Sequence, residues 1–318
     1  MRRAGTGDSD SERMNGGSIP GLTGKAAFTL SGPQPSTIPV LIAVPHAGRV
    51  YPASLLKLMR HPDSAAMRLE DRYADLLAES VAKATGAMLL VANAPRAMID
   101  LNRAPDDVDW DMIQSDSVAD IGSYTPGKRA RSGLGLIPRR LPGIGELWKR
   151  RHEQEELTQR ISDVHEPYHD CLARTLEELR RRWGAALLID LHSMPSLARR
   201  GTQAPPEFVV GDRFGAACDG RFIASAFSYF EGHERHAVHN RPYAGGYVLE
   251  RHAAPHRGLH ALQLEIDRDT YLDARLAEPG KGFAAMTELL MGLVNRIAGE
   301  VAALGQTEID SSWPEAAE

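Results

Sequence analysis

Polar side chains of the types that hydrolases use follow four apolar runs, each typical of a buried strand. In open α/β sheets, ligands bind at the carboxyl ends of the strands. Imidazole is the commonest protein ligand of metal ions, and a buried carboxylate can act as a general base. The four positions therefore predict one metal-dependent hydrolytic pocket, built from His46, His192, Glu265 and the pair Asn102–Arg103.

The two histidines each allow a structural role as well as a catalytic one. His46 stands between an apolar run and the turn at Ala47 and Gly48, where it could equally cap a neighbouring backbone group. His192 lies two residues after Asp190, so strand alternation places both side chains on one side. Asp190 is thus a candidate for orienting the imidazole, and a buried polar pair that only satisfies backbone groups is the alternative.

Glu265 and the Asn102–Arg103 pair are candidates for the base and for a substrate anchor. A carboxylate at the inner end of an apolar strand is costly to bury unless it is paired or used, and burial raises its pKa toward that of a general base. A structural ion pair with Arg268 is the alternative for Glu265. The planar fork of Arg103 suits a substrate carboxylate, and its alternative is a salt bridge within the following loop.

Glu70 and Asp71 precede an expected helix, where a carboxylate can cap the helix N-terminus. A carboxylate is also what two histidines need to complete a three-ligand catalytic zinc site with one open position. Both interpretations are open from the local sequence. For His165 and His169, on an expected helix, a packing role is favoured over one in which either of them faces the pocket.

The alternation of strands and helices predicts an α/β fold, with a mixed, largely parallel sheet flanked by helices. A helix over residues 146–183 should kink near Glu166, because Pro167 follows it. Further helices are expected over residues 69–85 and 286–304. Strands are expected over residues 40–44, 88–92, 97–101, 185–191, 208–210 and 262–266, with another near Val248.

The expected domain organisation is a single catalytic domain over residues 24–304. Residues 1–23 are expected to be a disordered tail and residues 305–318 a loose acidic tail. Residues 104–145 form an inserted loop rich in Asp, Ser, Gly and Pro, and such long loops are often functional. Within it, residues 133–139 are a candidate lid over the site.

The amino-acid composition argues against nucleic-acid and membrane partners and leaves small molecules as the expected ligands. The formal net charge of −5 provides no general attraction for nucleic acid. The apolar runs are far shorter than the ~20 residues of a membrane span. The two cysteines exclude a Cys-rich zinc site and fit a reducing compartment, so a cytoplasmic location without membrane or nucleic-acid partners is expected. The oligomeric state is left open.

Six short motifs in this order resemble the N-formylglutamate amidohydrolase family over about residues 38–271. That family is similar to the zinc carboxypeptidases and aspartoacylases, and it implies a phosphorylase/hydrolase-like, zinc-peptidase-like architecture. The motifs are Pro-His-Ala-Gly at 45–48, Arg96 with Ile-Asp-Leu-Asn-Arg at 99–103, Pro-Tyr-His at 167–169, Asp-Leu-His-Ser at 190–193, Asn240 with Gly-Gly at 245–246, and Leu-Gln-Leu-Glu at 262–265.

The resemblance implies hydrolysis of N-formyl-L-glutamate, or a close N-acyl amino acid, to formate and glutamate, a reaction of histidine degradation. It implies Zn²⁺, or another divalent ion, at His46, Asp71 and His192, with Glu265 catalytic. Relatives with a His-x-x-Glu motif have Glu where Arg49 stands here, so the second ligand is assigned to Asp71, with Glu70 as the fallback.

Two cationic anchors would be needed for a dicarboxylate substrate. Arg96, Asn102 and Arg103 are assigned to the first, and Arg139 or Arg241 to the second. Two alternatives remain open: an enzyme for another N-acyl amino acid or small peptide amide, and a non-catalytic binding protein on the same fold.

Overall fold

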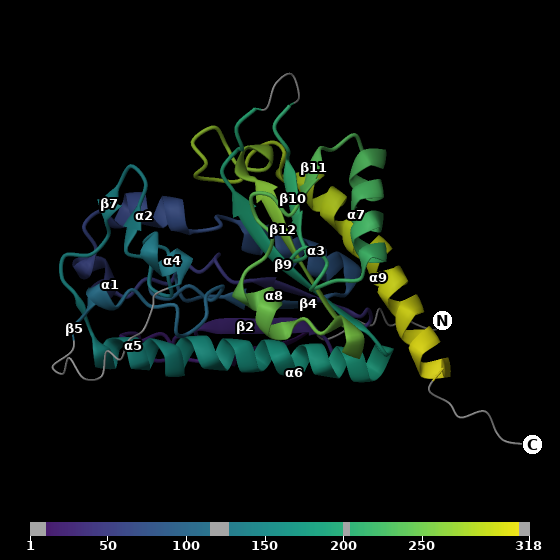
Figure 1. Ribbon diagram of the computed structural model, residues 1–318, viewed down its shortest axis with the longest axis horizontal. Helices are drawn as coiled ribbons and strands as arrows, with labels where there is room; N and C mark the ends of the chain where they lie inside the picture. Colours follow the sequence, from purple (N-terminus) through teal and green to yellow (C-terminus); the bar gives the residue numbers. More distant parts are fainter. Residues whose placement is uncertain (1–10, 115–126, 200–203, 312–318) are drawn as a thin grey trace, which may run out of the picture.

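Apolar segments of the chain assemble into a central eight-stranded sheet, as seen in the computed structural model, which describes residues 11–114, 127–199 and 204–311 (Figure 1). The four middle strands are parallel, and antiparallel strands flank them. The strand order is β1 (Ser11–Gly16), β2 (Phe28–Pro33), β4 (Met88–Ala92), β3 (Val40–Val44), β9 (Ala186–Met194), β12 (Leu259–Asp267), β10 (Phe208–Gly211) and β11 (Ala237–His239), the last parallel to β10.

The central strands β3, β9 and β12 are buried along their whole length. Parallel strands covered on both faces have continuous apolar sequences, which explains why these runs show little polar alternation. Successive side chains still point to opposite faces. In β3, Leu41 and Ala43 join one apolar cluster, whereas Val40, Ile42 and Val44 join the other.

Helices cover both faces of the sheet. One layer contains α3 (Ala74–Thr85), α7 (Gly220–Gly232) and α9 (Phe283–Ser311), in which α3 and α7 both pack against α9. On the other face, the long helix α6 (Glu166–Trp183) runs along the lower edge of the molecule in Figure 1, with α8 (Tyr247–His252) nearby. The predicted fold class, a mixed and largely parallel α/β sheet flanked by helices, is confirmed.

The remaining elements are short and lie mainly in the first half of the chain. They are α1 (Ala53–Leu58), α2 (Pro62–Leu69), α4 (Lys128–Arg131), α5 (Gln154–Arg160), and the two-residue strands β5 (Ile113–Gln114), β6 (Arg140–Leu141), β7 (Gly145–Glu146) and β8 (His152–Glu153). A π-helical turn, Ile161–His165, joins α5 to α6 directly before Pro167. The expected irregularity at this proline therefore takes the form of a widened turn. No helix among the described residues is long and apolar enough to cross a bilayer.

Several expected elements differ from the structure. Residues 97–101 are a loop rather than a strand, because turns beginning at Pro95 and Asp100 fold this segment back on itself. Val248 lies in α8 instead of a strand. The helix expected from residue 69 begins at Ala74, since Tyr73 adopts a left-handed backbone conformation just before it.

The expected tails and lid also need correction. Residues 11–16 pair with β2 as strand β1, so the ordered part of the chain begins before residue 24. Residues 17–23 are ordered as well, with Ile19 buried, and helix α9 extends to Ser311, well into the segment expected to be loose. Residues 1–10 and 312–318 lie outside the described residues. The candidate lid over residues 133–139 is packed into the core through Leu136 and Ile137, which are buried.

Candidate metal centre and active site

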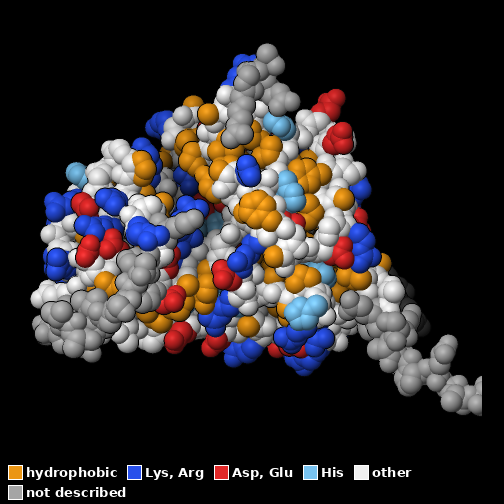
Figure 2. Space-filling view, viewed as in Figure 1, with side chains coloured by type: hydrophobic (Ala, Val, Ile, Leu, Met, Phe, Trp, Pro, Cys, Tyr) orange, Lys and Arg blue, Asp and Glu red, His pale blue; other side chains and the backbone are white. Residues whose placement is uncertain are grey.

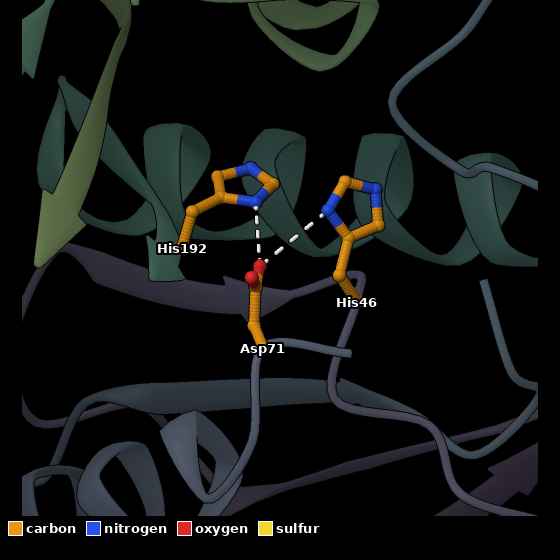
Figure 3. Close-up of side chains that lie close together, drawn as sticks. All are labelled: His46, Asp71 and His192. Carbon is orange, nitrogen blue, oxygen red and sulfur yellow. Dashed lines mark hydrogen bonds and ion pairs between the residues drawn. The ribbon is translucent and has the colours of Figure 1, made fainter. Parts of the chain in front are cut away.

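Three separate segments bring His46, Asp71 and His192 together at the carboxyl edge of the sheet (Figure 3). His46 follows the end of β3, and His192 lies near the end of β9. Asp71 lies in the linker between α2 and α3, where its backbone N–H donates to the carbonyl of His46 at 2.9 Å. All three side chains are buried.

The three side chains present their ligand atoms toward a common point. Oδ2 of Asp71 lies 3.0 Å from Nδ1 of His192 and 3.4 Å from Nδ1 of His46. Two atoms bound to a tetrahedral zinc at about 2.1 Å lie about 3.4 Å from each other, close to both distances. Nδ1 of His46 is also buried without a hydrogen-bond partner. A cation would satisfy this atom, so the donor set fits a zinc-like ion.

Further carboxylates hold both imidazoles by their other nitrogen. Nε2 of His46 lies 2.7 Å from Oδ1 of Asp100, and Nε2 of His192 lies 2.9 Å from Oδ2 of Asp190. A carboxylate in this position accepts the N–H and leaves Nδ1 with its lone pair available for a metal. Both histidines therefore share one arrangement, with Nε2 held and Nδ1 directed at the shared point.

Asp71 is oriented in the same way. Its Oδ1 atom accepts hydrogen bonds from the hydroxyl of Ser193 at 3.0 Å and from Nη2 of Arg268 at 3.2 Å. Arg268 also donates to the carbonyl of Glu70 at 2.7 Å, which fixes the linker itself. These contacts occupy Oδ1 and leave Oδ2 facing the two imidazoles.

The electrostatics of the site reflect its buried charges. Burial alone would raise the pKa of Asp71, but the hydrogen bond with His192 and the nearby imidazole of His46 hold it well below its usual value. Burial alone would lower the pKa of His192, but Asp190 and Asp71 raise it well above its usual value. Without a cation, His192 therefore tends to be protonated and paired with these carboxylates.

Glu265 lies beside His192, because the two residues occupy matched positions on the parallel strands β12 and β9. Its side chain is buried, and it lines the same cavity as the three ligand candidates. Burial raises its pKa to about 7, against the lowering effect of His192. A carboxylate with such a pKa can both accept and release a proton near neutral pH.

A cavity of about 600 Å³ opens in front of these residues. The face shown in Figure 2 is hollowed near its centre, with basic side chains around the hollow. Among the residues that the structure describes, six arginines line the cavity, of which Arg96 and Arg103 were predicted from the sequence. The other four are Arg68, Arg129, Arg213 and Arg268. Five carboxylates of the described residues line it as well, namely Asp71, Asp106, Asp107, Glu250 and Glu265, so the cavity offers groups of both charges to a ligand.

The two predicted arginines of the cavity are held firmly. Arg96 forms two bonds with Oδ2 of Asp100, from Nε at 2.9 Å and from Nη2 at 2.8 Å. Arg103 donates from Nε to the carbonyl of Leu134 and from Nη1 to the carbonyl of Asn102. Both guanidinium groups are thus fixed at the cavity wall before a ligand arrives.

Arg139 and Arg241 do not join the cavity, contrary to the expectation that one of them anchors a second carboxylate. The guanidinium of Arg139 forms ion pairs with Asp109 and Glu146, each at 3.0 Å. It lines a separate surface depression. Arg241 is exposed and absent from the cavity lining. The fallback ligand Glu70 is paired with Arg72 at 3.0 Å and lies outside the ligand cluster.

Four residues have roles in the site that the sequence does not predict. Asp100 contacts His46 from a turn, where the sequence predicts a strand. Gln263 belongs to a strand with an apolar pattern, yet it donates to Glu265 at 2.8 Å. The links from Ser193 and Arg268 to Asp71 depend on the tertiary fold. For Asp100 and Gln263, the local signal is a polar residue that interrupts an apolar run.

Comparisons with known proteins identify the family of this chain. The chain is 30% identical to N-formylglutamate deformylase of Pseudomonas aeruginosa over 271 residues, covering 81% of this chain and 93% of the relative. It is 29% identical to the Pseudomonas putida protein of the same name, covering 74% and 82%. The crystal structure of N-formylglutamate amidohydrolase from Ralstonia eutropha JMP134 superposes with a TM-score of 0.79 at 30% identity, over 88% of this chain and 99% of that one. Residues 38–272 match the family profile, and the chain belongs to the N-formylglutamate amidohydrolase family.

Proposed function

We propose that this protein is a metal-dependent amidohydrolase that cleaves N-formyl-L-glutamate into formate and glutamate. The observation that carries the proposal is the convergence of His46, Asp71 and His192, with Glu265 beside them in an arginine-lined cavity. The names of the relatives, which share about 30% of their residues with this chain, support the same substrate.

His46, Asp71 and His192 would hold the cation, and two histidines with one carboxylate are a ligand set of catalytic zinc sites. A divalent cation in such a site supplies Lewis-acid activation of water and of the amide carbonyl. The protein contributes by fixing the three ligand atoms before binding. Asp100 and Asp190 set the tautomers of the histidines, and Ser193 with Arg268 sets the orientation of Asp71.

Glu265 would act as the general base and then as the general acid. Its carboxylate takes a proton from the attacking water as the new C–O bond forms at the formyl carbon. It then delivers that proton to the amide nitrogen as the C–N bond breaks, which releases formate and the free amine. The raised pKa of about 7 suits both transfers.

Arg96 and Arg103 would bind substrate carboxylates, since both line the cavity and both are held in place. A dicarboxylate requires a second cationic anchor. Arg68, Arg129 and Arg213 line the same cavity and replace Arg139 and Arg241 as candidates for it.

The test is to purify the protein, measure its metal content, and assay release of formate from N-formyl-L-glutamate before and after chelation. We expect about one divalent ion per chain, turnover that is lost on chelation, and recovery when Zn²⁺ is restored. Full activity in metal-depleted protein would contradict the proposal. Metal content reduced to traces, with no turnover after reloading, would favour a non-catalytic binding protein.

A close N-acyl amino acid is the second candidate substrate. The cavity of about 600 Å³ leaves room for an acyl group larger than formyl. A panel of N-formyl, N-acetyl and longer N-acyl derivatives of glutamate and aspartate, compared by kcat/KM, separates the two candidates.

A further inference from the structure

A line of three hydrogen bonds leads from the backbone of α8 to Glu265. The N–H of Val248 donates to Oδ1 of Asn102 at 3.0 Å, and Nδ2 of Asn102 donates to Oε1 of Gln263 at 3.3 Å. Nε2 of Gln263 then donates to Oε1 of Glu265 at 2.8 Å. Every side chain in this line is buried.

The two ends of the line fix its direction. A backbone N–H such as that of Val248 can only donate, so Asn102 must turn its oxygen toward α8 and its NH₂ group toward Gln263. An ionised carboxylate can only accept, so Gln263 must turn its NH₂ group toward Glu265. Each amide therefore has one favourable orientation, and each choice agrees with the other.

We propose that Gln263 is the positioning residue of Glu265, held in its orientation by Asn102 and the backbone of Val248. The proposal rests on the role of Glu265 in the proposed function. The bond from Gln263 occupies Oε1. Among the described residues, no hydrogen bond reaches Oε2, which therefore remains available to water in the cavity.

The main chain around Asn102 is fixed on both sides by the two histidines for which the sequence favours a packing role. Nε2 of His169 donates to the carbonyl of Leu101 at 3.0 Å, and Nε2 of His165 donates to the carbonyl of Arg103 at 2.9 Å. Since carbonyls only accept, both histidines carry their proton on Nε2. Asn102 is thereby held between two anchored peptide groups.

The close approach of the 245–248 segment depends on Gly246. A Cβ atom added there would lie 2.4 Å from Oδ1 of Asn102, far inside contact distance. Glycine thus permits the backbone of this segment to reach the amide. The hydrogen bond between Val248 and Asn102 therefore requires a glycine at position 246.

The contacts of Asn102 with other protein groups argue against a role for it in binding a substrate carboxylate. Its oxygen accepts from Val248, while Nδ2 lies within 3.4 Å of Gln263, His192 and Asp190. The amide is already engaged by protein groups at both ends. A carboxylate clamp should affect KM when removed, whereas a positioning chain should affect kcat.

The test compares Gln263→Met, which keeps the side-chain length and removes the donor, with the wild-type protein. We expect bound metal to remain stoichiometric, KM to change less than about threefold, and kcat to fall by roughly 10- to 100-fold, as for a misplaced catalytic group. The matched control is Leu264→Met on the same strand, whose side chain packs in the cluster on the opposite face. Its kcat should stay within about twofold of wild type.

Two further variants keep the test decisive. Gly246→Ala should also lower kcat, because the added methyl group displaces Asn102. If the Gln263 variant does not fold or does not bind metal, Gly246→Ala tests the positioning role by itself. In the background of Glu265→Gln, adding Gln263→Met should cause no further loss, because both changes affect the same step.

The outcomes distinguish this proposal from the proposed function. Wild-type kcat in Gln263→Met or Gly246→Ala, or a rise in KM alone, would overturn the positioning role. So would a further loss when Gln263→Met is added to Glu265→Gln. If Glu265→Gln itself retains turnover, the base is misassigned and the proposed function fails first.

Discussion

Glu265 and His192 occupy matched positions on the adjacent parallel strands β12 and β9. Their side chains therefore point to the same face of the sheet. His192 belongs to the ligand cluster, and Glu265 lies beside it. This pairing puts the proposed base next to a proposed metal ligand, with both residues on strands. Sites built on strands are held more precisely than sites built on loops.

Replacing Glu265 with Gln should strongly lower turnover while the metal stays bound. The amide keeps the size of the side chain and cannot accept the proton from water, so kcat should fall by about 10²- to 10⁴-fold. The measurement is formate release together with metal content by atomic spectroscopy. Loss of metal in this variant would instead make Glu265 a ligand.

Replacing Asp100 with Asn should weaken metal binding by roughly 10- to 100-fold, because the partner that orients His46 loses its charge. Competition with a chromophoric chelator measures the change. Asp190→Asn should behave similarly through His192, whereas Asp75→Asn, which only loses the ion pair with Arg49, should leave the affinity unchanged. Equal affinities in all three variants would show that these carboxylates do not tune the site.

Metal affinity should fall as pH falls. Asp190 and Asp71 raise the pKa of His192 in the metal-free protein, and the cation needs the neutral imidazole, so protons compete with the metal below that pKa. Affinity should drop by up to about tenfold per pH unit for one such proton. Calorimetric titration in two buffers of different ionisation enthalpy counts the released protons, and Glu265→Gln separates the contribution of the carboxylate. A constant affinity between pH 6 and pH 8 would contradict this assignment.

Replacing Arg103 with Ala should reduce kcat/KM for N-formyl-L-glutamate, by about 1.5–3 kcal/mol of transition-state binding if one charged hydrogen bond is lost. Metal content should not change. Arg139→Ala is the matched control, since that guanidinium is neutralised by Asp109 and Glu146 away from the cavity. Its kinetics should equal those of the wild type, and a comparable loss there would place the substrate elsewhere.

The sequence predicted those parts of the site that follow from strand ends. His46, His192 and Glu265 each follow or end an apolar run, and parallel strands bring such positions to one edge. Asp71 came from a family resemblance, because the linker that positions it has no periodic pattern of its own.

The other parts depend on tertiary contacts that no local pattern encodes. The carboxylate of Asp100 reaches His46 only because residues 97–101 turn instead of forming a strand. Arg139 carries the right charge for an anchor, but local acids neutralise it, and charge alone did not reveal its partners. Val248 illustrates the ambiguity of short apolar stretches, which suit strands and buried helices equally.

The linker between α2 and α3 has a consequence for how the empty and loaded forms differ. Asp71 and His192 are separated by 121 residues in the sequence. An ion bound by both side chains would therefore link two distant parts of the chain. The two apolar clusters, one on each face of the sheet, do not include these ligands, so removing the ion should leave both clusters intact. Protein freed of metal by a chelator should keep its helical circular dichroism but have a lower Tm than the metal-bound protein. The difference in Tm should grow as the concentration of free metal ion given to the metal-bound sample rises.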